Sequence, residues 1–545
     1  MRVVLDIETT SDHSHIWMVC LRNIDNPKET WTFRNASESL SELLQSCDLI
    51  AGHNLIAFDR WVLQNCWKIQ IPWMKCFDTL TVSRLLNPNL EGGHSLDNWG
   101  RIVGVPKFEY SAWDNPDLEK MEEYCLQDTL VTLAVYEEQQ KRLKRFKFSD
   151  KSVWIEHETQ VIVSEQERNG VFIDSQKLFS LNAEITDKYE LLSSKLVAKY
   201  PPKIIHLKTK TKEVPFNPGS RMQIIEQLKA NGWEPSEFTE KGNVELNEDI
   251  LESLVPTIPD AKDFLDYFLL EKRKSQLAQW IKYLDNDGRI HGKVITNGAV
   301  TGRATHASPN LGQVVAVDKP YGKEFRSIFT VPEGYSLIGA DLSGIELRCL
   351  AHYMKDDEYT NEVLNGDVHT KNQLAAGLPT RANAKTFIYA FLYGAGAAKI
   401  GSIVGGGSHT GQKLIKKFLS GVPKLKELKE TVEKLAAKGS LPGLDGRRVW
   451  VRSSHSSLNT LLQSAGAIIS KAWMIRAREN LQRAGIPYKQ VLWVHDEIEM
   501  EVLNQYAEEV AKILIVSANE TQEMLGFRVR VDAEAKIGKT WADVH

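Results

Sequence analysis

The sequence predicts an α/β domain over residues 1–145, followed by a larger α+β region. In the first region, short runs of branched and apolar residues alternate with runs of helical periodicity, which is typical of an α/β domain. In the second region, two strand-like runs at 335–341 and 490–502 lie on either side of a long helical stretch. With 545 residues, of which 42% are hydrophobic, the chain is long enough for about two to four domains.

Composition and charge exclude several classes of protein. The formal charge is −4 and the isoelectric point about 6.4, so any nucleic-acid binding must rest on local basic patches. One such patch is the run KRLKRFKFSDK at 141–151, for which a solvated helix end is an equally good interpretation. The six cysteines show no C-x-x-C spacing, which favours reduced thiols over disulfides or a zinc site. No apolar run approaches the roughly 18 residues of a membrane span, and we expect a soluble, cytoplasmic protein.

The run VVLDIETT at 3–10 is predicted to be a strand that carries two acids. Because successive side chains of a strand point to opposite faces, Asp6 and Glu8 project from one face and the neighbouring apolar residues from the other. Two like charges on one face repel each other. We therefore expect a cation between them.

Three further polar residues of the first region belong with this pair. Asp59 opens a helix directly after the strand-like run DLIAGHN at 48–54, and Tyr124 and Asp128 stand four residues apart on one face of a helix over 116–144. Carboxylates of this kind suit Mg²⁺ or Mn²⁺, and two such ions can support phosphodiester cleavage. Taken singly, each acid is better interpreted as a surface charge or a helix cap.

A second set of acids lies far apart in the sequence. A strand through 337–338 ends at Asp341, and the run KQVLWVHDEIEMEV at 489–502 predicts a hairpin with Asp496 and Glu497 at its tip. The two aspartates can meet across adjacent strands and form a second two-metal site. Between them lies Glu346, for which a capping box with Ser343 is the alternative interpretation.

The run LPTRANAKTFIYAFLYGAG at 378–396 predicts a helix with a basic stripe. Arg381, Lys385 and Tyr389 follow one another at steps of four, and Tyr393 continues the stripe. Two cations one turn apart repel each other, so a polyanion such as a nucleotide triphosphate would stabilise them. A solvated basic face is the alternative.

Two sets of motifs resemble known enzyme families. In the first region, DIETT at 6–10, HNLIAFD at 53–59 and YCLQD at 124–128 resemble the three motifs of the proofreading 3′–5′ exonucleases. In the second region, DLSGIELRCLAH at 341–352, RANAKTFIYAFLYGAG at 381–396 and VHDE at 494–497 resemble motifs A, B and C of the family A DNA polymerases. The runs NGDVHTKN, NGAVTGRATHASPNLGQ and LDGRRVWVRSSHSSLNTLLQSAGA are similar to those of the bacteriophage replicative type that recruits thioredoxin.

This resemblance implies a ribonuclease H-like exonuclease domain followed by a right-hand polymerase domain. The expected boundaries are exonuclease 1–145, linker 146–175, thumb 176–290, first palm part 291–357, fingers 358–440 and second palm part 441–545. The implied function is template-directed DNA synthesis on a primer 3′ end with proofreading, in the replication of a phage genome. A single-subunit RNA polymerase and an inactive DNA-binding scaffold are the alternatives.

The resemblance also implies a role for each site residue. The ligands of Mg²⁺, or of Mn²⁺, would be Asp341 and Asp496 in the polymerase site, and Asp6, Glu8, Asp59 and Asp128 in the exonuclease site, with two ions in each. Tyr124 would orient the attacking water, and Glu497 would support the polymerase acids. The incoming dNTP would contact His369, Arg381, Lys385, Tyr389, Glu346 and Tyr393, where Lys385 also protonates the leaving group and Glu346 excludes ribose. Primer–template DNA would contact Arg303, Asn459 and Gln463 through its minor groove.

One stretch departs from the thioredoxin-recruiting relatives. Between Tyr200 and Phe216 too few residues remain for their thumb insertion, so we expect that thioredoxin is not a partner. The basic run from Lys208 to Lys212 is then either a DNA contact or a solvated loop. The resemblance leaves a phage helicase–primase and a single-strand-binding protein as candidate partners, and the chain is expected to be a monomer. No 5′ nuclease domain is expected ahead of Met1, which favours replication over repair.

Overall fold

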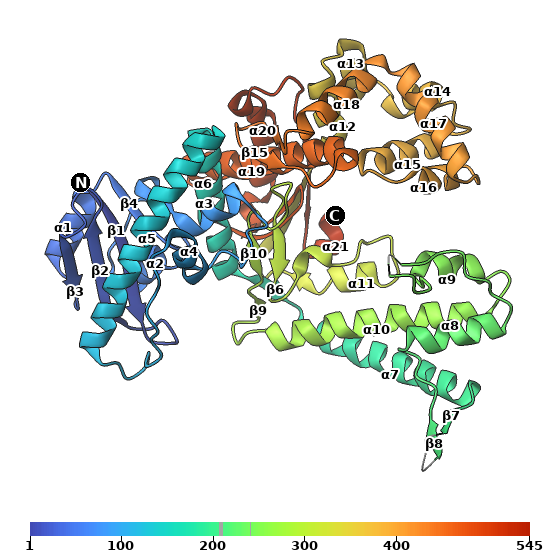
Figure 1. The fold of residues 1–545 in the computed structure, drawn as a ribbon, viewed down its shortest axis with the longest axis horizontal. Helices are drawn as coiled ribbons and strands as arrows, with labels where there is room; N and C mark the ends of the chain where they lie inside the picture. The colour runs from blue at the N-terminus through green and yellow to red at the C-terminus, as the bar shows by residue number, and fades with distance from the viewer. Residues whose placement is uncertain (207–210, 240) are drawn as a thin grey trace. The chain divides into compact units, whose positions relative to one another are not determined.

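The computed structural model describes residues 1–206, 211–239 and 241–545, which form two compact units (Figure 1). The first unit comprises Met1–Gly170, Gly292–Val314 and Val331–His545, and the second comprises Val171–His291 and Val315–Thr330. Among the described residues, no helix is both long enough and apolar enough to cross a lipid bilayer.

A five-stranded mixed sheet forms the amino-terminal part of the first unit. Its spatial order is β3 (Thr30–Phe33), β2 (Ile16–Asn23), β1 (Arg2–Thr9), β4 (Leu49–Gly52) and β5 (Cys76–Asp78). β1 pairs antiparallel with β2 and parallel with β4. Val3, Leu5 and Ile7 of β1 share one buried apolar cluster, which leaves Asp6 and Glu8 on the opposite face. The alternation predicted for this strand is confirmed.

Helices connect and cover these strands. They are α1 (Glu38–Ser46), α2 (Asp59–Val62), α3 (Thr79–Leu86), α4 (Leu96–Val103) and α5 (Leu118–Phe146), with the π-helical turn η1 (Leu63–Trp67) and the 3₁₀ turn η2 (Trp73–Lys75). The long helix α5 packs against β1 and β2, so its residues come close to the acids of β1. All six cysteines are unpaired, as predicted.

A four-stranded antiparallel sheet forms the centre of the carboxy-terminal part. Its order is β16 (Tyr488–Val494), β17 (Glu497–Leu503), β13 (Tyr335–Leu342) and β18 (Ala533–Gly538). The predicted strand and hairpin are thus confirmed, and the register places Asp341 opposite Glu497. The helices α19 (Ser457–Ala484) and α20 (Ala507–Leu525) pack against each other, and the short helix α21 (Trp541–Val544) packs on β13 and β18.

The segment between β13 and α19 is largely helical. It contains α12 (Ile345–Met354), α13 (Asp357–Asn365), α14 (Val368–Ala376), α15 (Arg381–Leu392), α16 (Ala397–Ser402), α17 (Ser408–Gly421) and α18 (Pro423–Ala436). The ribbon β14 (Ser440–Pro442) with β15 (Arg448–Trp450) and the turn η4 (Ser454–Ser456) follow these helices. Short elements elsewhere in the first unit are β10 (Lys293–Ile295), β11 (Thr305–Ala307), η3 (Leu311–Gln313) and η5 (Asn504–Tyr506). The apolar faces of α12, α14, α15 and α19 share one core with the central sheet.

A buried group of charges joins three segments of the first unit. Residues 146–175, predicted to be a linker, contain the helix α6 (Asp150–Asn169), which packs against α19 and β16. Glu156 of α6 accepts hydrogen bonds from Arg447, before β15, at 2.7 Å and from Lys471 of α19 at 2.6 Å. Arg447 also pairs with Asp445 at 2.6 Å. Two acids and two bases are thus buried together, which stabilises them only as long as the set is complete.

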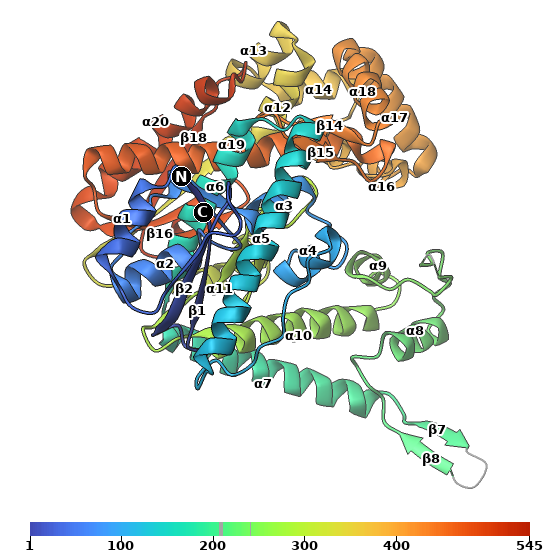
Figure 2. The ribbon, with the colours of Figure 1, turned by 60° about the vertical axis from the view of Figure 1, so that its left-hand side comes forward.

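The second unit is built on two long helices, α7 (Ser175–Lys199) and α10 (Asp260–Tyr283), which pack against each other. It also contains α8 (Arg221–Ala230), α9 (Glu248–Leu254), α11 (Gly322–Arg326) and a small sheet of β12 (Phe329–Thr330), β6 (Val171–Ile173) and β9 (Arg289–Ile290). After α7, β7 (Lys203–His206) and β8 (Thr211–Val214) form a ribbon beyond the helix end (Figure 2). The predicted thumb range 176–290 falls within this unit, although the domain boundaries stay a prediction. Of the basic run 208–212, residues 208–210 lie outside the described residues.

We expect Lys471→Met to destabilise the first unit strongly. It leaves Glu156 with fewer partners in a fully buried site, and breaking a buried ion pair costs about 3–5 kcal/mol. Thermal unfolding followed by circular dichroism checks this, with exposed Lys438→Met as the matched control. Equal melting temperatures for the two variants would show that the buried charges do not hold these segments together.

Candidate active sites

The face of β1 that carries Asp6 and Glu8 is the floor of a buried acidic site. Ligand atoms of the two carboxyl groups lie within 4.8 Å of each other and of the Cys125 thiol of α5, which donates to Asp6 at 3.5 Å. Burial, and then the neighbouring acids, raise the pKa of Asp6 to about 7 and that of Glu8 to about 10. These raised values mean that the ionised forms lack enough positive charge around them.

Asp59 and Asp128 complete this site from two helices. Asp59 is the first residue of α2, is 4% exposed, and has a pKa raised by burial and by Asp6. Asp128 lies on α5, is 3% exposed, and stands one turn after Tyr124. The structure therefore brings together all five residues predicted for this site. Their oxygens form the donor set that Mg²⁺ and Mn²⁺ prefer.

Lys107 also reaches this site, and sequence reasoning missed it. Its ammonium group lies 2.5 Å from a carboxylate oxygen of Asp128 and 5.1 Å from the centre of the Tyr124 ring. Burial opposes its charge, but Asp128 raises the pKa of Lys107 above its ordinary value. The residue lies in the irregular segment between α4 and α5, where no periodic pattern indicated which side chains turn inward.

The second pair of acids meets in the four-stranded sheet. Asp341 lies near the end of β13 and Asp496 in the turn between β16 and β17, and the amide of Leu342 donates to the carbonyl oxygen of Asp496 at 3.1 Å. Burial, and then Glu346, raise the pKa of Asp496 to about 6, and burial and Glu497 raise the pKa of Asp341. Two acids more than 150 positions apart in the sequence thus become neighbours, one near the end of β13 and the other in the turn before β17.

Glu497 is held by the end of the chain. The indole N–H of Trp541 donates to its carboxylate at 2.8 Å, and Nδ1 of His545 lies 2.9 Å from the same oxygen. Although burial opposes it, hydrogen bonds from His545 and Trp541 help to lower the pKa of Glu497 to about 2. Sequence reasoning did not find Trp541 and His545, because only the packing of α21 on β13 and β18 brings them here.

Glu346 joins a network at the start of α12. The capping box with Ser343 is absent, because the helix is preceded by Gly344 at φ 57° and has no side-chain cap. Instead, the carboxylate of Glu346 accepts a hydrogen bond from Tyr393 at 2.6 Å and lies 3.9 Å from Arg303. The Asn459 amide in turn donates to the carbonyl oxygen of Tyr393 at 3.1 Å. The alternative interpretation of Glu346 as a helix cap is therefore wrong.

The remaining predicted residues lie on α14, α15 and α19. Arg381 pairs with Asp367 at 2.7 Å, and the same aspartate caps α14, which carries His369. The ring centres of His369 and Tyr389 are 6.1 Å apart. An acid of the chain itself thus balances Arg381, which the sequence-based argument for a phosphate overlooked. Lys385 is exposed one turn further along α15, and Gln463 lies one turn after Asn459 on α19.

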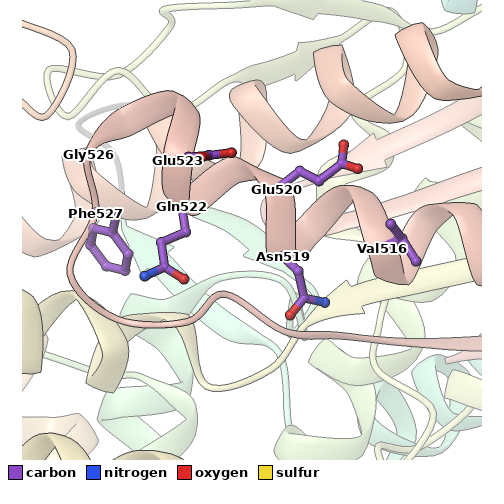
Figure 3. A pocket seen from close by; sticks show the side chains of 7 residues that line it. All are labelled: Val516, Asn519, Glu520, Gln522, Glu523, Gly526 and Phe527. Atoms are coloured by element: carbon purple, nitrogen blue, oxygen red, sulfur yellow. The ribbon is translucent and has the colours of Figure 1, made fainter.

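Two pockets of the first unit differ in whether the predicted site residues line them. A small pocket is lined by Arg303, His495 and Asp496 together with Ala304, Ile345 and Trp493, among others. A larger, open hollow of about 560 Å³ lies at the end of α20, where Glu520, Glu523 and Phe527 line it (Figure 3). None of the predicted site residues lines this hollow. Size alone therefore does not locate the candidate sites.

Comparisons with known proteins agree with this geometry. The family model for DNA polymerase family A matches residues 190–543. The DNA-directed DNA polymerase of Escherichia phage T7 is 35% identical over 654 aligned positions, which cover 91% of this chain and 92% of the relative, and that of Enterobacteria phage T3 gives the same values. The thermostable DNA polymerase I of Thermus aquaticus is 27% identical over 73% of this chain and 49% of its own length.

A solved structure shares the fold. It is the POL domain of Pol1 from M. smegmatis in complex with a DNA primer-template and dNTP, and it matches with a TM-score of 0.82 over 99% of this chain and 96% of its own. The sequence identity of 19% limits this likeness to the fold. The family model and the phage relatives decide the family. This chain belongs to DNA polymerase family A.

Proposed function

We propose that this chain extends the 3′ end of a primer by template-directed addition of deoxynucleotides and removes mispaired ends by a 3′–5′ exonuclease activity. The observation that carries the first activity is the antiparallel pairing of β13 with β17, which places Asp341 beside the turn that holds Asp496. The buried acids on β1, α2 and α5 support the second activity, in a domain of the ribonuclease H-like kind. The phage relatives support a role in phage genome replication.

The acids of both sites fit divalent cations of the Mg²⁺ type. Both sites contain carboxyl groups whose pKa values are raised by burial and by a neighbouring acid, so added positive charge would stabilise their ionised forms. Asp341 and Asp496 would hold two ions in the polymerase site. Such ions activate the primer hydroxyl and neutralise charge on the leaving pyrophosphate.

The basic stripe of α15 is proposed to bind the triphosphate. Arg381, Lys385 and His369 lie on two adjoining helices and would donate hydrogen bonds to phosphate oxygens. When a triphosphate arrives, Arg381 would exchange its contact with Asp367 for one with the ligand. Among the described residues, Lys385 forms no hydrogen bond or ion pair with another side chain, and it would give its proton to the departing pyrophosphate.

Selection of the sugar is proposed to rest on Glu346 and Tyr393. Their hydrogen bond fixes the Glu346 carboxylate next to Asp496. A ribose 2′-hydroxyl would clash with this carboxylate or leave it without a partner, and such rejection can be large. This arrangement disfavours the RNA polymerase alternative, which a comparison of deoxynucleotide and ribonucleotide incorporation would test directly.

Contacts to the duplex are proposed for Arg303, Asn459 and Gln463. The first two already belong to the network around Glu346 and Tyr393, so they would link base-pair shape to sugar selection. Minor-groove acceptors are nearly the same for every correct base pair, which suits an enzyme that must copy any sequence.

The exonuclease site is proposed to hold its ions on Asp6, Glu8, Asp59 and Asp128. Tyr124, which lies one turn before Asp128 on α5, would orient the attacking water. The short ribbon β7–β8 occupies the stretch in which a thioredoxin-binding insertion would be expected, and independence of thioredoxin stays a prediction. A monomer that works with a helicase–primase and a single-strand-binding protein is proposed on the resemblance to phage replicative polymerases alone.

Separate removal of the two sets of acids should separate the two activities. We expect Asp341→Ala to lower primer extension by about 10²-fold or more, because an ion ligand contributes several kcal/mol to the transition state. Excision of single-stranded DNA should remain. The double variant Asp6→Ala with Glu8→Ala should show the reverse. Extension and excision of labelled oligonucleotides in Mg²⁺ measure both, and a wild type inactive in both assays would favour the inactive scaffold.

Tyr389 should make the enzyme accept chain terminators. In this family a tyrosine here goes with use of dideoxynucleotides, in which its hydroxyl would replace a hydrogen bond of the missing 3′-hydroxyl. We expect Tyr389→Phe to increase discrimination against dideoxynucleotides by at least about tenfold, which is the size of one hydrogen bond. Primer extension with mixed substrates measures the ratio. Strong rejection by the wild type that Tyr389→Phe leaves unchanged would contradict the prediction.

The exonuclease acids should make stability depend on pH and Mg²⁺. The pKa of Asp6 is raised to about 7 in the folded chain, so the folded state binds more protons than the unfolded state above about pH 4. The free energy of unfolding of the metal-free protein should therefore fall as pH rises from about 4 through about 7.

Mg²⁺ should reverse this loss by binding the ionised acids. We expect Mg²⁺ to raise the melting temperature by several degrees at pH 8 and by much less at pH 5. In Asp6→Asn with Glu8→Gln, both the fall with pH and the effect of Mg²⁺ should shrink. Differential scanning calorimetry across this pH range measures them, and equal profiles for wild type and variant would exclude these acids as the cause.

A further inference from the structure

The segment between α4 and α5 positions Lys107 in the exonuclease site. The side-chain amide of Gln127, on α5, donates to the carbonyl oxygen of Pro106 at 2.6 Å, which fixes the backbone directly before the lysine. Further along, Asp114 accepts hydrogen bonds from Ser11 at 2.9 Å, and the indole of Trp17 donates to the Trp113 carbonyl at 2.8 Å. The segment is therefore tied to α5, to β2 and to the loop after β1.

Lys107 itself is a half-buried cation that faces several acids. Its side chain is 20% exposed and that of its partner Asp128 is 5% exposed. Its charge also acts on Asp6 and Glu8, whose ionised forms it stabilises. Burying an ammonium group costs free energy unless the group is paired. A lysine that served only as a surface charge would keep its ammonium group in solvent and would not carry this cost.

The surroundings suit a nucleotide as well as a metal. The rings of Tyr110, Trp113 and Tyr124 form a cluster with centre-to-centre distances of 5.0–5.6 Å. Tyr124 thus lies between the aromatic side chains of this segment and the acids, directly under the Lys107 ammonium group. A strand end that presents its last phosphate to the acids would bring that phosphate within reach of the lysine.

We propose that Lys107 is a catalytic residue of the excision reaction and binds a non-bridging oxygen of the scissile phosphate. This inference rests on the proposed exonuclease function. Once divalent ions occupy Asp128 and the other acids, the ammonium group loses its partner, and the substrate phosphate is the anion that replaces it. Such a donor stabilises the negative charge that accumulates on the phosphate oxygens in the transition state.

The bond changes are those of a hydrolysis. The water oxygen bonds to phosphorus and gives a proton to solvent, and the bond between phosphorus and the 3′ oxygen breaks. That oxygen takes a proton from solvent, so the strand ends in a 3′-hydroxyl group and a nucleoside 5′-monophosphate leaves. Lys107 keeps its proton throughout and acts only as a hydrogen-bond donor.

Three lysine variants of the whole chain test this role. We expect Lys107→Met to lower kcat for excision of single-stranded DNA at saturating Mg²⁺ by about 10²-fold, the usual effect of losing one such donor. Lys107→Arg should retain most of the activity, because it still donates to phosphate. Lys120→Met is the matched control, since Lys120 is an exposed lysine of α5 that pairs only weakly with Asp117 at 3.5 Å. Primer extension should be unchanged in all three, which also shows that they fold.

A binding measurement supplies a readout that does not depend on turnover. In Ca²⁺, fluorescence anisotropy with a labelled single-stranded oligonucleotide should show weaker binding for Lys107→Met than for Lys107→Arg or Lys120→Met. If Lys107 were only an internal counter-ion that competes with metal, Lys107→Met would bind Mn²⁺ more tightly in calorimetric titration and would excise at least as fast as the wild type. That result, or unchanged oligonucleotide affinity, would overturn the proposal.

Failure of the underlying exonuclease function would look different. In that case the wild type would show no metal-dependent excision, or the variant Asp6→Ala with Glu8→Ala would excise as the wild type does. The proposed role of Lys107 would then be rejected together with the proposed exonuclease function. Loss of excision in the acid variant with full excision in Lys107→Met would instead reject the lysine alone.

Discussion

Repulsion among closely placed carboxylates is the constraint on which both candidate sites depend. Acids that lie this close raise the pKa values of their neighbours, as Asp6 does for Glu8 and Glu346 for Asp496. Only a rigid support can hold them at such distances. In the first site a strand of the five-stranded sheet supplies that support, and in the second the antiparallel ladder of β13 and β17 does so.

The chain balances the two sets of acids in different ways. In the amino-terminal site an internal cation, Lys107, contacts Asp128, while Glu8 keeps a strongly raised pKa. In the carboxy-terminal site Glu497 is turned toward Trp541 and His545, whose hydrogen bonds stabilise its charge. This arrangement leaves Asp341 and Asp496 as the acids most in need of added positive charge. A divalent ion would thus be bound most favourably where the proposed chemistry needs it.

The helices above the second site extend the same electrostatic pattern. The basic residue Arg381 is balanced by Asp367, and Glu346 is held by Tyr393. An incoming triphosphate would replace Asp367 as the partner of Arg381, and the sugar of the nucleotide would lie against the Glu346 carboxylate. The network continues through Asn459 to α19, so that the residues proposed for sugar selection and those proposed to contact the duplex share one set of contacts.

Local pattern in the sequence was sufficient to predict the strands of both sites and the helices that carry Asp59, Asp128 and Arg381, because alternation and helical periodicity depend on near neighbours. The motifs also indicated the family, which the comparisons establish. Local pattern misled at Glu346, where a glycine at positive φ replaces the expected cap.

Only the tertiary structure decided which distant groups complete each site. Lys107 comes from an irregular segment, and Trp541 and His545 come from the last residues of the chain, so no periodicity marked them. Their positions follow from how α5 packs on the five-stranded sheet and how α21 packs on β13 and β18. A sequence determines which residues can form a strand or a helix, whereas the contacts between those elements, fixed by packing across long sequence separations, determine which charges meet.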